Sequence, residues 1–256
     1  GLSNDPMAEF DPARNFKENA AVPALLAYVS RCAGVRRFIY AGSCSVYGYT
    51  DNEIFDETSP TISDSPYGIS KLQGEFACLQ LSRDNFSVVA LRKGTVSGYS
   101  PRMRLDLIVN TMFKCAMSDG RIIVNNPAIW RPLLAMRDAV SAYVCAVEAP
   151  MECSGAFNVA SGNYTVGEVA EQVRDSLRTY LDLETEIETR TIRDFRNYRV
   201  STQKAKAELG FNPTQSVNDI VKELVDHVDE FRDFDEDRYY NIRVFKSITS
   251  RSGAFV

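Results

Sequence analysis

The strongest constraint on the fold of this chain is an alternation of helix-length and strand-length segments in its first hundred residues. Residues 11–33 place apolar side chains at helical spacing and end at Gly34. A short β-rich run follows at residues 36–41, Pro66 opens a second helical segment, and residues 87–91 form another apolar run. Strands joined by crossovers of this length are parallel, and helices cover such a sheet. The sequence therefore predicts an α/β fold.

The remainder of the 256-residue chain is more mixed. Periodicity predicts helices at residues 106–118, 138–149, 165–181, 202–209 and 216–231, and strands at 156–159 and 184–192. The tail from Asp233 is polar and poorly patterned, so we expect it to be loosely held. No run of about 18 apolar residues occurs, and GLSNDPMAEF lacks the regions of a signal peptide. We therefore expect neither a membrane span nor an export signal.

Charge, cysteine and histidine content exclude several classes of function. A net charge of −5 argues against a broad nucleic-acid-binding surface. The six cysteines are scattered without a C-x-x-C pair; their even number permits disulfides, but apolar flanks favour buried free thiols in a reducing cytoplasm. The single histidine, His227, lies in an acidic helical stretch, where a surface position is favoured over a catalytic one. A zinc site and a Ser-His-Asp triad are both poorly supported, and no metal is predicted.

Three side chains suggest acid–base chemistry on an alcohol. Ser43, in G-S-C-S-V-Y-G, follows the first predicted strand, while Tyr67 and Lys71, in S-P-Y-G-I-S-K, begin a predicted helix. Tyr and Lys four residues apart share a helix face, and an ammonium group near a phenol lowers the phenol pKa from about 10 toward the working pH. Chance alone supplies roughly 0.4 Y-x-x-x-K pairs in a chain of this composition. In isolation, a solvated helix pair is the favoured interpretation.

The order of the motifs is more specific than any one of them. A strand, S-C-S-V-Y-G, about 20 residues, S-P-Y-x-x-S-K, another strand and a second domain resemble the extended short-chain dehydrogenase/reductase family over nearly the whole chain. Within it, the similarity is to NAD-dependent nucleotide-sugar epimerases and dehydratases. The resemblance implies a partial Rossmann-type doubly wound parallel sheet with a smaller C-terminal α/β substrate domain. We expect residues 1–98 to be the remainder of the NAD-binding domain and residues 99–256 to be mainly substrate-binding, with about 131–160 returning to the first domain.

The resemblance also implies roles for individual residues. Ser43, Tyr67 and Lys71 match the catalytic set, with Tyr67 as the acid/base. The residues expected at the cofactor are Asn19, Ala41, Tyr67 and Lys71, and those expected at the substrate are Ser45, Thr95, Asn110, Arg131 and Arg199. Arg131, in W-R-P-L-L-A-M-R-D, resembles the arginine that grips the nucleotide diphosphate. For Arg196 and Arg199 a surface cation is the favoured alternative.

Cofactor and partners follow from the same resemblance. It implies NAD as the cofactor, with NADP as an open alternative, and a nucleotide sugar as the substrate. No nucleic-acid or membrane partner is expected, and the location is expected to be cytoplasmic. Family members often dimerise through two helices per subunit, which here correspond to residues 11–33 and 67–84. We therefore expect a homodimer.

The first departure from the family concerns the residues after Ser43. Family dehydratases place Asp and Glu directly after the catalytic hydroxyl residue, whereas this chain has Cys44 and Ser45. Epimerases that act at carbons 3 and 5 carry a Cys two residues before the loop tyrosine, and here Ser45 holds that place before Tyr47. The residues therefore favour simple alcohol–ketone chemistry: 4-epimerisation, or reduction or oxidation of a nucleotide sugar.

The second departure is the lack of a glycine-rich cofactor loop. Neither G-x-x-G-x-x-G nor G-x-G-x-x-G occurs in the sequence, although the family uses such a loop to bind the pyrophosphate. By the family pattern we expect the chain to start near the end of the fourth strand, so that roughly 60–70 residues, about two βα units, precede it in the family. A non-catalytic relative used for binding or assembly is therefore the second hypothesis, and the intact Ser–Tyr–Lys set opposes it.

Overall fold

A computed structural model describes residues 1–50, 53–83, 85–191 and 197–251 of the chain. Its central sheet contains β1 (Arg37–Ser43), β3 (Ser87–Lys93) and β7 (Gly155–Val159), in the order β1-β3-β7. Both pairings are parallel, and the register of the first places Ser43 opposite Lys93. The α/β fold with a parallel sheet is confirmed.

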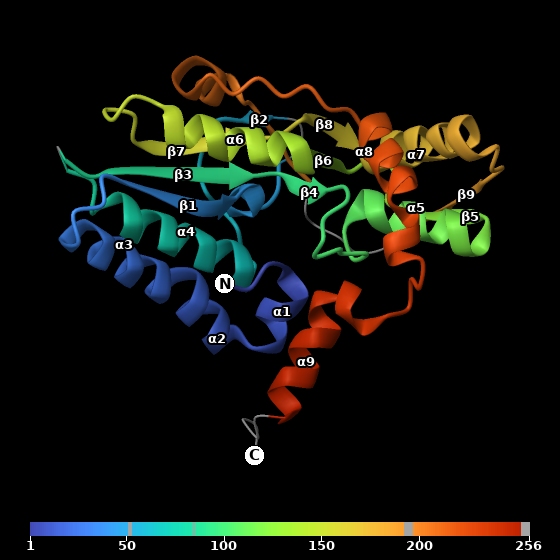
Figure 1. Ribbon diagram of the computed structural model, residues 1–256, viewed down its shortest axis with the longest axis horizontal. Coiled ribbons are helices and arrows are strands. Elements are labelled where there is room, and N and C mark those ends of the chain that lie inside the picture. Colours follow the sequence, from blue (N-terminus) through green and yellow to red (C-terminus); the bar gives the residue numbers. More distant parts are fainter. Residues whose placement is uncertain (51–52, 84, 192–196, 252–256) are drawn as a thin grey trace.

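Helices cover both faces of this sheet (Figure 1). On one face lie α3 (Val22–Cys32) and α4 (Pro66–Leu79), and on the other lies α6 (Met136–Glu148). Because side chains alternate along a strand, Val88 and Ala90 of β3 pack into the core on the α3–α4 side, whereas Val89 and Leu91 pack on the α6 side. The central strands are therefore apolar on both faces, as the run at residues 87–91 predicts.

The helix expected at residues 11–33 is present but interrupted. Pro23 has no N–H to donate to the carbonyl of Asn19, and the Tyr40 hydroxyl donates to that oxygen instead, at 2.8 Å. At Gly74 of α4, an added Cβ would lie 2.1 Å from the same carbonyl oxygen, so only glycine allows this close approach. The segment divides into α2 (Pro12–Phe16), a π-helical turn at Lys17–Ala21, and α3.

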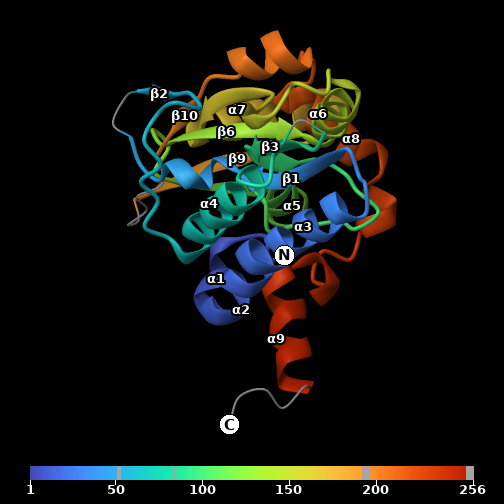
Figure 2. The ribbon, with the colours of Figure 1, turned by 90° about the vertical axis from the view of Figure 1, so that its left-hand side faces the viewer.

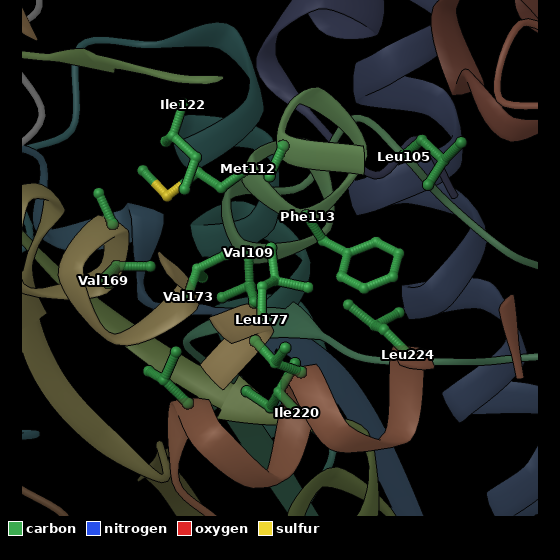
Figure 3. Close-up of a cluster of buried hydrophobic side chains, with 14 of the residues drawn as sticks. Leu105, Val109, Met112, Phe113, Ile122, Val169, Val173, Leu177, Ile220 and Leu224 are labelled. Carbon is green, nitrogen blue, oxygen red and sulfur yellow. The ribbon is translucent and has the colours of Figure 1, made fainter. Parts of the chain in front are cut away.

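A second layer is built mainly from the later part of the chain. It contains β4 (Thr95–Ser97), β6 (Trp130–Ala135) and β8 (Gly162–Thr165) in one sheet, the parallel pair β5 (Arg121–Asn125) and β9 (Glu186–Arg190), and the short pair β2 (Ile54–Phe55) and β10 (Arg199–Val200). Its helices are α5 (Ile108–Asp119), α7 (Val166–Leu181) and α8 (Val217–Asp226). Phe113, Leu177 and Ile220 from these three helices meet in one buried core, which Figure 3 shows.

Several boundaries differ from those expected. The helix expected at 216–231 ends at Asp226, and a 3₁₀ turn, Val228–Phe231, follows it. The helix expected at 202–209 is largely a π-helical segment, Ala205–Leu209. The strand expected at 184–192 is confirmed over β9, while residue 192 lies outside the described residues.

The expectation that the tail from Asp233 is loosely held is wrong. The tail forms a 3₁₀ turn, Asp237–Tyr239, and then α9 (Asn241–Arg251), which packs against α1 (Asp5–Phe10) (Figures 1 and 2). The Phe245 ring is 4% exposed and meets Phe10 edge-on, with 5.9 Å between the ring centroids. Ile242 and Phe245, three residues apart, gave a helical signal, but their apolar partner lies at the opposite end of the sequence and could not be read from local pattern.

All six cysteines are free thiols. Within the described ranges, no helix combines the length and apolar character needed to cross a membrane.

Candidate active site

A pocket of about 590 Å³ opens where β1 and β3 end. Ser43, Tyr67, Lys93 and Arg131 are among the side chains that line it. The carboxyl ends of parallel strands are where α/β proteins bind their ligands, because the chain departs there into loops that can carry functional groups. The sheet thus places the Ser43 and Tyr67 segments, 24 residues apart in sequence, at one site.

Ser43 is both the last residue of β1 and the cap of the following turn. Its Oγ accepts hydrogen bonds from the Ser45 backbone N–H at 3.2 Å and from the Ser45 hydroxyl at 2.9 Å. These bonds fix the Ser43 hydroxyl at the start of the 3₁₀ turn Cys44–Tyr47. With both acceptor positions directed to Ser45, the Ser43 proton can be donated to another oxygen in the pocket.

Tyr67 and Lys71 are positioned by the start of α4. The Ser65 hydroxyl caps this helix by accepting from the Gly68 N–H at 3.0 Å, and Pro66 occupies its first turn, as the sequence predicts. The Lys71 ammonium donates to the Ala41 carbonyl at 3.2 Å and lies 5.8 Å from the centre of the Tyr67 ring. The Ser65 cap sets where α4 begins, and with it the positions of Tyr67 and Lys71 relative to β1.

The charge state of this pair differs from the expectation that Lys71 brings the pKa of Tyr67 down toward the working pH. Burial raises the pKa of Tyr67 to about 12, outweighing the lowering by a hydrogen bond with Ser43 and by Arg104. Burial, and then the nearby charge of Lys93, lower the pKa of Lys71 to about 8. The physical reason is burial, which disfavours the charged form of both side chains. At neutral pH Tyr67 is therefore a neutral phenol, ready to donate a proton.

A buried ion pair lies two helical turns beyond Tyr67. Arg92 of β3 donates to Glu75 of α4 through Nε at 2.9 Å and Nη2 at 2.6 Å, and the two side chains are 5% and 1% exposed. Arg92 Nη1 also donates to the Tyr47 hydroxyl at 2.8 Å. Since Tyr67, Lys71 and Glu75 are spaced four residues apart, the ion pair fixes the helix face that carries the other two.

Cys44 is directed away from the pocket. Its thiol is fully buried and donates to the Arg92 carbonyl at 3.0 Å, and burial raises its pKa far above the ordinary value. Ser45 lines the pocket, but its hydroxyl donates to Ser43. The two positions after Ser43 therefore present no ionisable group to a ligand.

The residues expected at the substrate divide into two groups. Ser45, Thr95 and Arg131 line the pocket. Asn110 is fully buried outside its lining, and its side-chain amide bonds the backbone of Gly98 and Arg104 at 2.8–3.0 Å. This geometry fits a role in holding the loop that carries Arg104.

Arg199, Asn19 and Ala41 also lie outside the pocket lining. The Arg199 guanidinium stacks over the Trp130 ring at 4.7 Å. Asn19 is buried, and its Nδ2 donates to Asn15 at 2.8 Å and to Ser70 at 3.3 Å. Ala41 contributes its carbonyl to Lys71. Arg196 lies outside the described residues.

Sequence reasoning missed two cations of this pocket, Lys93 and Arg104. Lys93 had a usable signal, because it follows a predicted parallel strand by two residues, and strand ends of this kind point to the site. Arg104 had none. Its Nε bonds Asp106 at 2.8 Å in a loop whose path is fixed by Asn110 and by tertiary contacts.

This chain offers contacts to only one end of a nicotinamide cofactor, the end that carries the nicotinamide ribose. The Lys71 ammonium uses one of its three protons on Ala41 and can offer others to a ribose hydroxyl close to Tyr67. The sequence holds no glycine-rich loop to bind the pyrophosphate. The residues present therefore suit the nicotinamide ribose, next to the place where Tyr67 and Ser43 would hold a substrate oxygen.

Fold and site together describe a doubly wound α/β protein with a Ser–Tyr–Lys set at the carboxyl edge of its sheet. Comparison with known families agrees, since residues 1–160 match the NAD dependent epimerase/dehydratase family. This chain belongs to that family.

Curated relatives cover the chain only in part. A dTDP-glucose 4,6-dehydratase from Streptomyces niveus is 25% identical over 203 residues, which are 77% of this chain and 57% of the relative. The chain thus spans less than two thirds of that relative's length.

Solved structures show the same fold. A UDP-glucose-4-epimerase from Stenotrophomonas maltophila with bound NAD superposes with a TM-score of 0.79 at 18% identity, over 91% of this chain and 75% of that one. RMD from Pseudomonas aeruginosa, complexed with NADPH, superposes with a TM-score of 0.77 at 23% identity, over 90% of this chain and 80% of that one. Members of the family thus bind NAD or NADPH.

Proposed function

We propose that this protein is an NAD-dependent epimerase or oxidoreductase that acts on a nucleotide-diphosphate sugar through a transient keto intermediate. The observation that carries the proposal is that Ser43 and Tyr67 line one pocket, while the Lys71 ammonium lies behind them, 5.8 Å from the centre of the Tyr67 ring. A hydroxyl that can donate, a phenol and an ammonium are what the interconversion of an alcohol and a ketone requires. Family membership and the nucleotide-sugar names of the relatives support this substrate class.

Each side chain has a defined part in the proposed reaction. The nicotinamide, when bound, supplies or takes the hydride. Tyr67, a neutral phenol at neutral pH, gives its proton to the keto oxygen during reduction and accepts it back during oxidation. Ser43 donates to the same oxygen and polarises it. Lys71 stabilises the phenolate while the proton is on the substrate and holds the cofactor ribose.

The surroundings of Cys44 and Ser45 favour this chemistry over dehydration. Elimination of water from a sugar needs an acid and a base close to the reacting carbons. Cys44 is buried with a raised pKa, and Ser45 donates to Ser43. We therefore favour 4-epimerisation, or simple reduction or oxidation, over the dehydratase activity that one relative's name carries.

The remaining assignments are part of the same proposal. Residues 1–98 hold the cofactor, and residues 99–256 mainly hold the substrate, with about 131–160 returning to the first domain and Arg131 on the diphosphate. The protein is a homodimer through α3 and α4, which expose Leu25, Leu26 and Phe76 at 61%, 54% and 52%.

The decisive experiment replaces the Tyr67 phenol. Tyr67→Phe in the full protein should lower turnover of the nucleotide sugar by roughly 10²–10⁴-fold while the circular dichroism spectrum stays unchanged. Tyr28→Phe, which removes a half-exposed phenol on α3, is the matched control and should turn over normally. A Tyr67→Phe protein with near-normal kcat would defeat the mechanism.

The missing glycine-rich sequence supports one alternative, a non-catalytic relative used for binding or assembly. Titrating the full protein with NAD and NADH distinguishes this alternative from the proposed enzyme. Binding of neither cofactor would favour the alternative, because the reaction proposed above requires one of them.

A further inference from the structure

Two lysines approach the candidate site, Lys93 from the end of β3 and Lys71 from α4. Lys93 ends β3 directly opposite Ser43, and it lines the pocket. The ammonium of Lys71 is bound to the carbonyl of Ala41, which lies two residues before Ser43 on the neighbouring strand. Gly42, between Ala41 and Ser43, lines the same pocket as Lys93. Both lysines therefore border the pocket at the ends of β1 and β3.

Lys93 is held in place by an aromatic side chain from the other face of the sheet. Its Nζ donates to the Tyr143 hydroxyl of α6 at 3.2 Å and lies 5.6 Å from the centre of that ring. This contact is a hydrogen bond and a cation–π interaction, neither of which neutralises the charge.

The surroundings offer neither ammonium group a compensating anion. Lys71 faces Tyr67 from α4 and Tyr40 from β1, and Lys93 faces Tyr143. Across residues 1–50, 53–83, 85–191 and 197–251, no carboxylate forms an ion pair with either lysine. The carboxylates that line the pocket are those of Asp5 and Asp106, and Asp106 pairs with Arg104 at 2.8 Å. Repulsion between the two charges is therefore screened only weakly.

We propose that Lys93 is a positioning residue that acts through Lys71, and that it sets the pH range in which the Ser43–Tyr67–Lys71 site can exchange its proton. Lys71 stabilises the Tyr67 phenolate only while its amine is protonated, because the phenolate needs a nearby cation. The positive charge of Lys93 makes the Lys71 proton easier to lose. The direction found for the pKa of Lys71, lowered by burial and by Lys93, agrees with this geometry. The effect on turnover rests on the proposed function, whereas the effect on the charge of Lys71 does not.

The first test measures Lys71 directly, without substrate. In the full protein labelled with ¹³C-lysine, the Lys71 side-chain resonance, assigned by its loss in Lys71→Arg, is followed by NMR against pH. Lys93→Met should move its titration midpoint upward, by up to about one pH unit, because it removes a like charge that makes the Lys71 proton easier to lose. Lys93→Arg keeps the charge and should restore the original midpoint.

A matched control comes from another lysine–tyrosine pair. Lys114 donates to Tyr240 at 3.4 Å and lies 5.5 Å from that ring, but it does not line the pocket. Lys114→Met should leave the Lys71 midpoint unchanged. If Lys93→Met does not fold, Lys93→Gln makes the same charge change with a polar side chain. An unchanged Lys71 midpoint in the folded, uncharged variant would overturn the inference.

The second test separates this inference from the proposed function. With a nucleotide sugar and NAD, the alkaline limb of the kcat profile should move upward in Lys93→Met by the same interval as the NMR midpoint and return in Lys93→Arg. A purely structural role would lower kcat at every pH without moving the limb. If the NMR midpoint moves but no variant turns over any nucleotide sugar, the proposed function fails and the inference stands.

Discussion

Removing one partner of the Glu75–Arg92 ion pair should destabilise the protein severely. Glu75→Met replaces the carboxylate with an apolar side chain of similar length and leaves a guanidinium group that is 5% exposed without its anion. Breaking a buried pair in this way costs about 3–5 kcal/mol, because the remaining charge keeps its desolvation penalty and loses its compensation. Against a typical total of 5–15 kcal/mol, this is a large share of the free energy of unfolding.

Urea denaturation followed by circular dichroism measures this cost. With a slope of about 3 kcal/mol per molar urea, a loss of 3–5 kcal/mol lowers the midpoint by about 1–1.7 M. The matched control is Glu18→Met, which removes a pair of the same length, Arg14–Glu18 at 2.6 Å, whose side chains are 39% and 29% exposed. That exposed pair contributes at most about 1 kcal/mol to the free energy of unfolding, so the urea midpoint of Glu18→Met should fall by about 0.3 M or less.

The double variant Glu75→Met/Arg92→Met tests the cause. Because it removes both charges, it should recover most of the stability that the single variant loses. Two results would refute the reasoning: a Glu75→Met midpoint no lower than that of Glu18→Met, or a double variant no more stable than the single one.

Two further predictions concern ligand and partner. Arg131→Ala should weaken binding of the nucleotide sugar by about 2 kcal/mol, measured by calorimetry, with little effect on NAD; unchanged sugar-nucleotide affinity would make Arg131 a structural residue. Leu26→Glu, which places a charge on the exposed apolar face of α3, should convert a dimer to monomers in analytical ultracentrifugation; a wild-type protein that sediments as a monomer would remove the proposed interface.

Local signals carried most of the fold and the centre of the candidate site. The apolar run at residues 87–91 needs burial on both faces, and the helical crossovers beside it point to a helix-covered parallel sheet. Ser65 and Pro66 cap and start α4 through bonds within four residues, so the sequence also indicated where Tyr67 and Lys71 begin their helix. These features depend on neighbours in the chain, which a sequence displays directly.

Other features depended on contacts between distant segments. The tail looked polar and loose, yet α9 is ordered because Phe245 meets Phe10, 235 residues earlier. The motif suggested that Lys71 lowers the pKa of Tyr67, but burial raises the pKa of Tyr67 and, together with Lys93, lowers the pKa of Lys71. What the sequence by itself determined was the α/β fold and the Ser–Tyr–Lys set. Only the tertiary structure decided the charge states and brought Lys93 to the pocket of Ser43 and Tyr67, because desolvation and Coulomb interactions depend on distances through space rather than on separation along the chain.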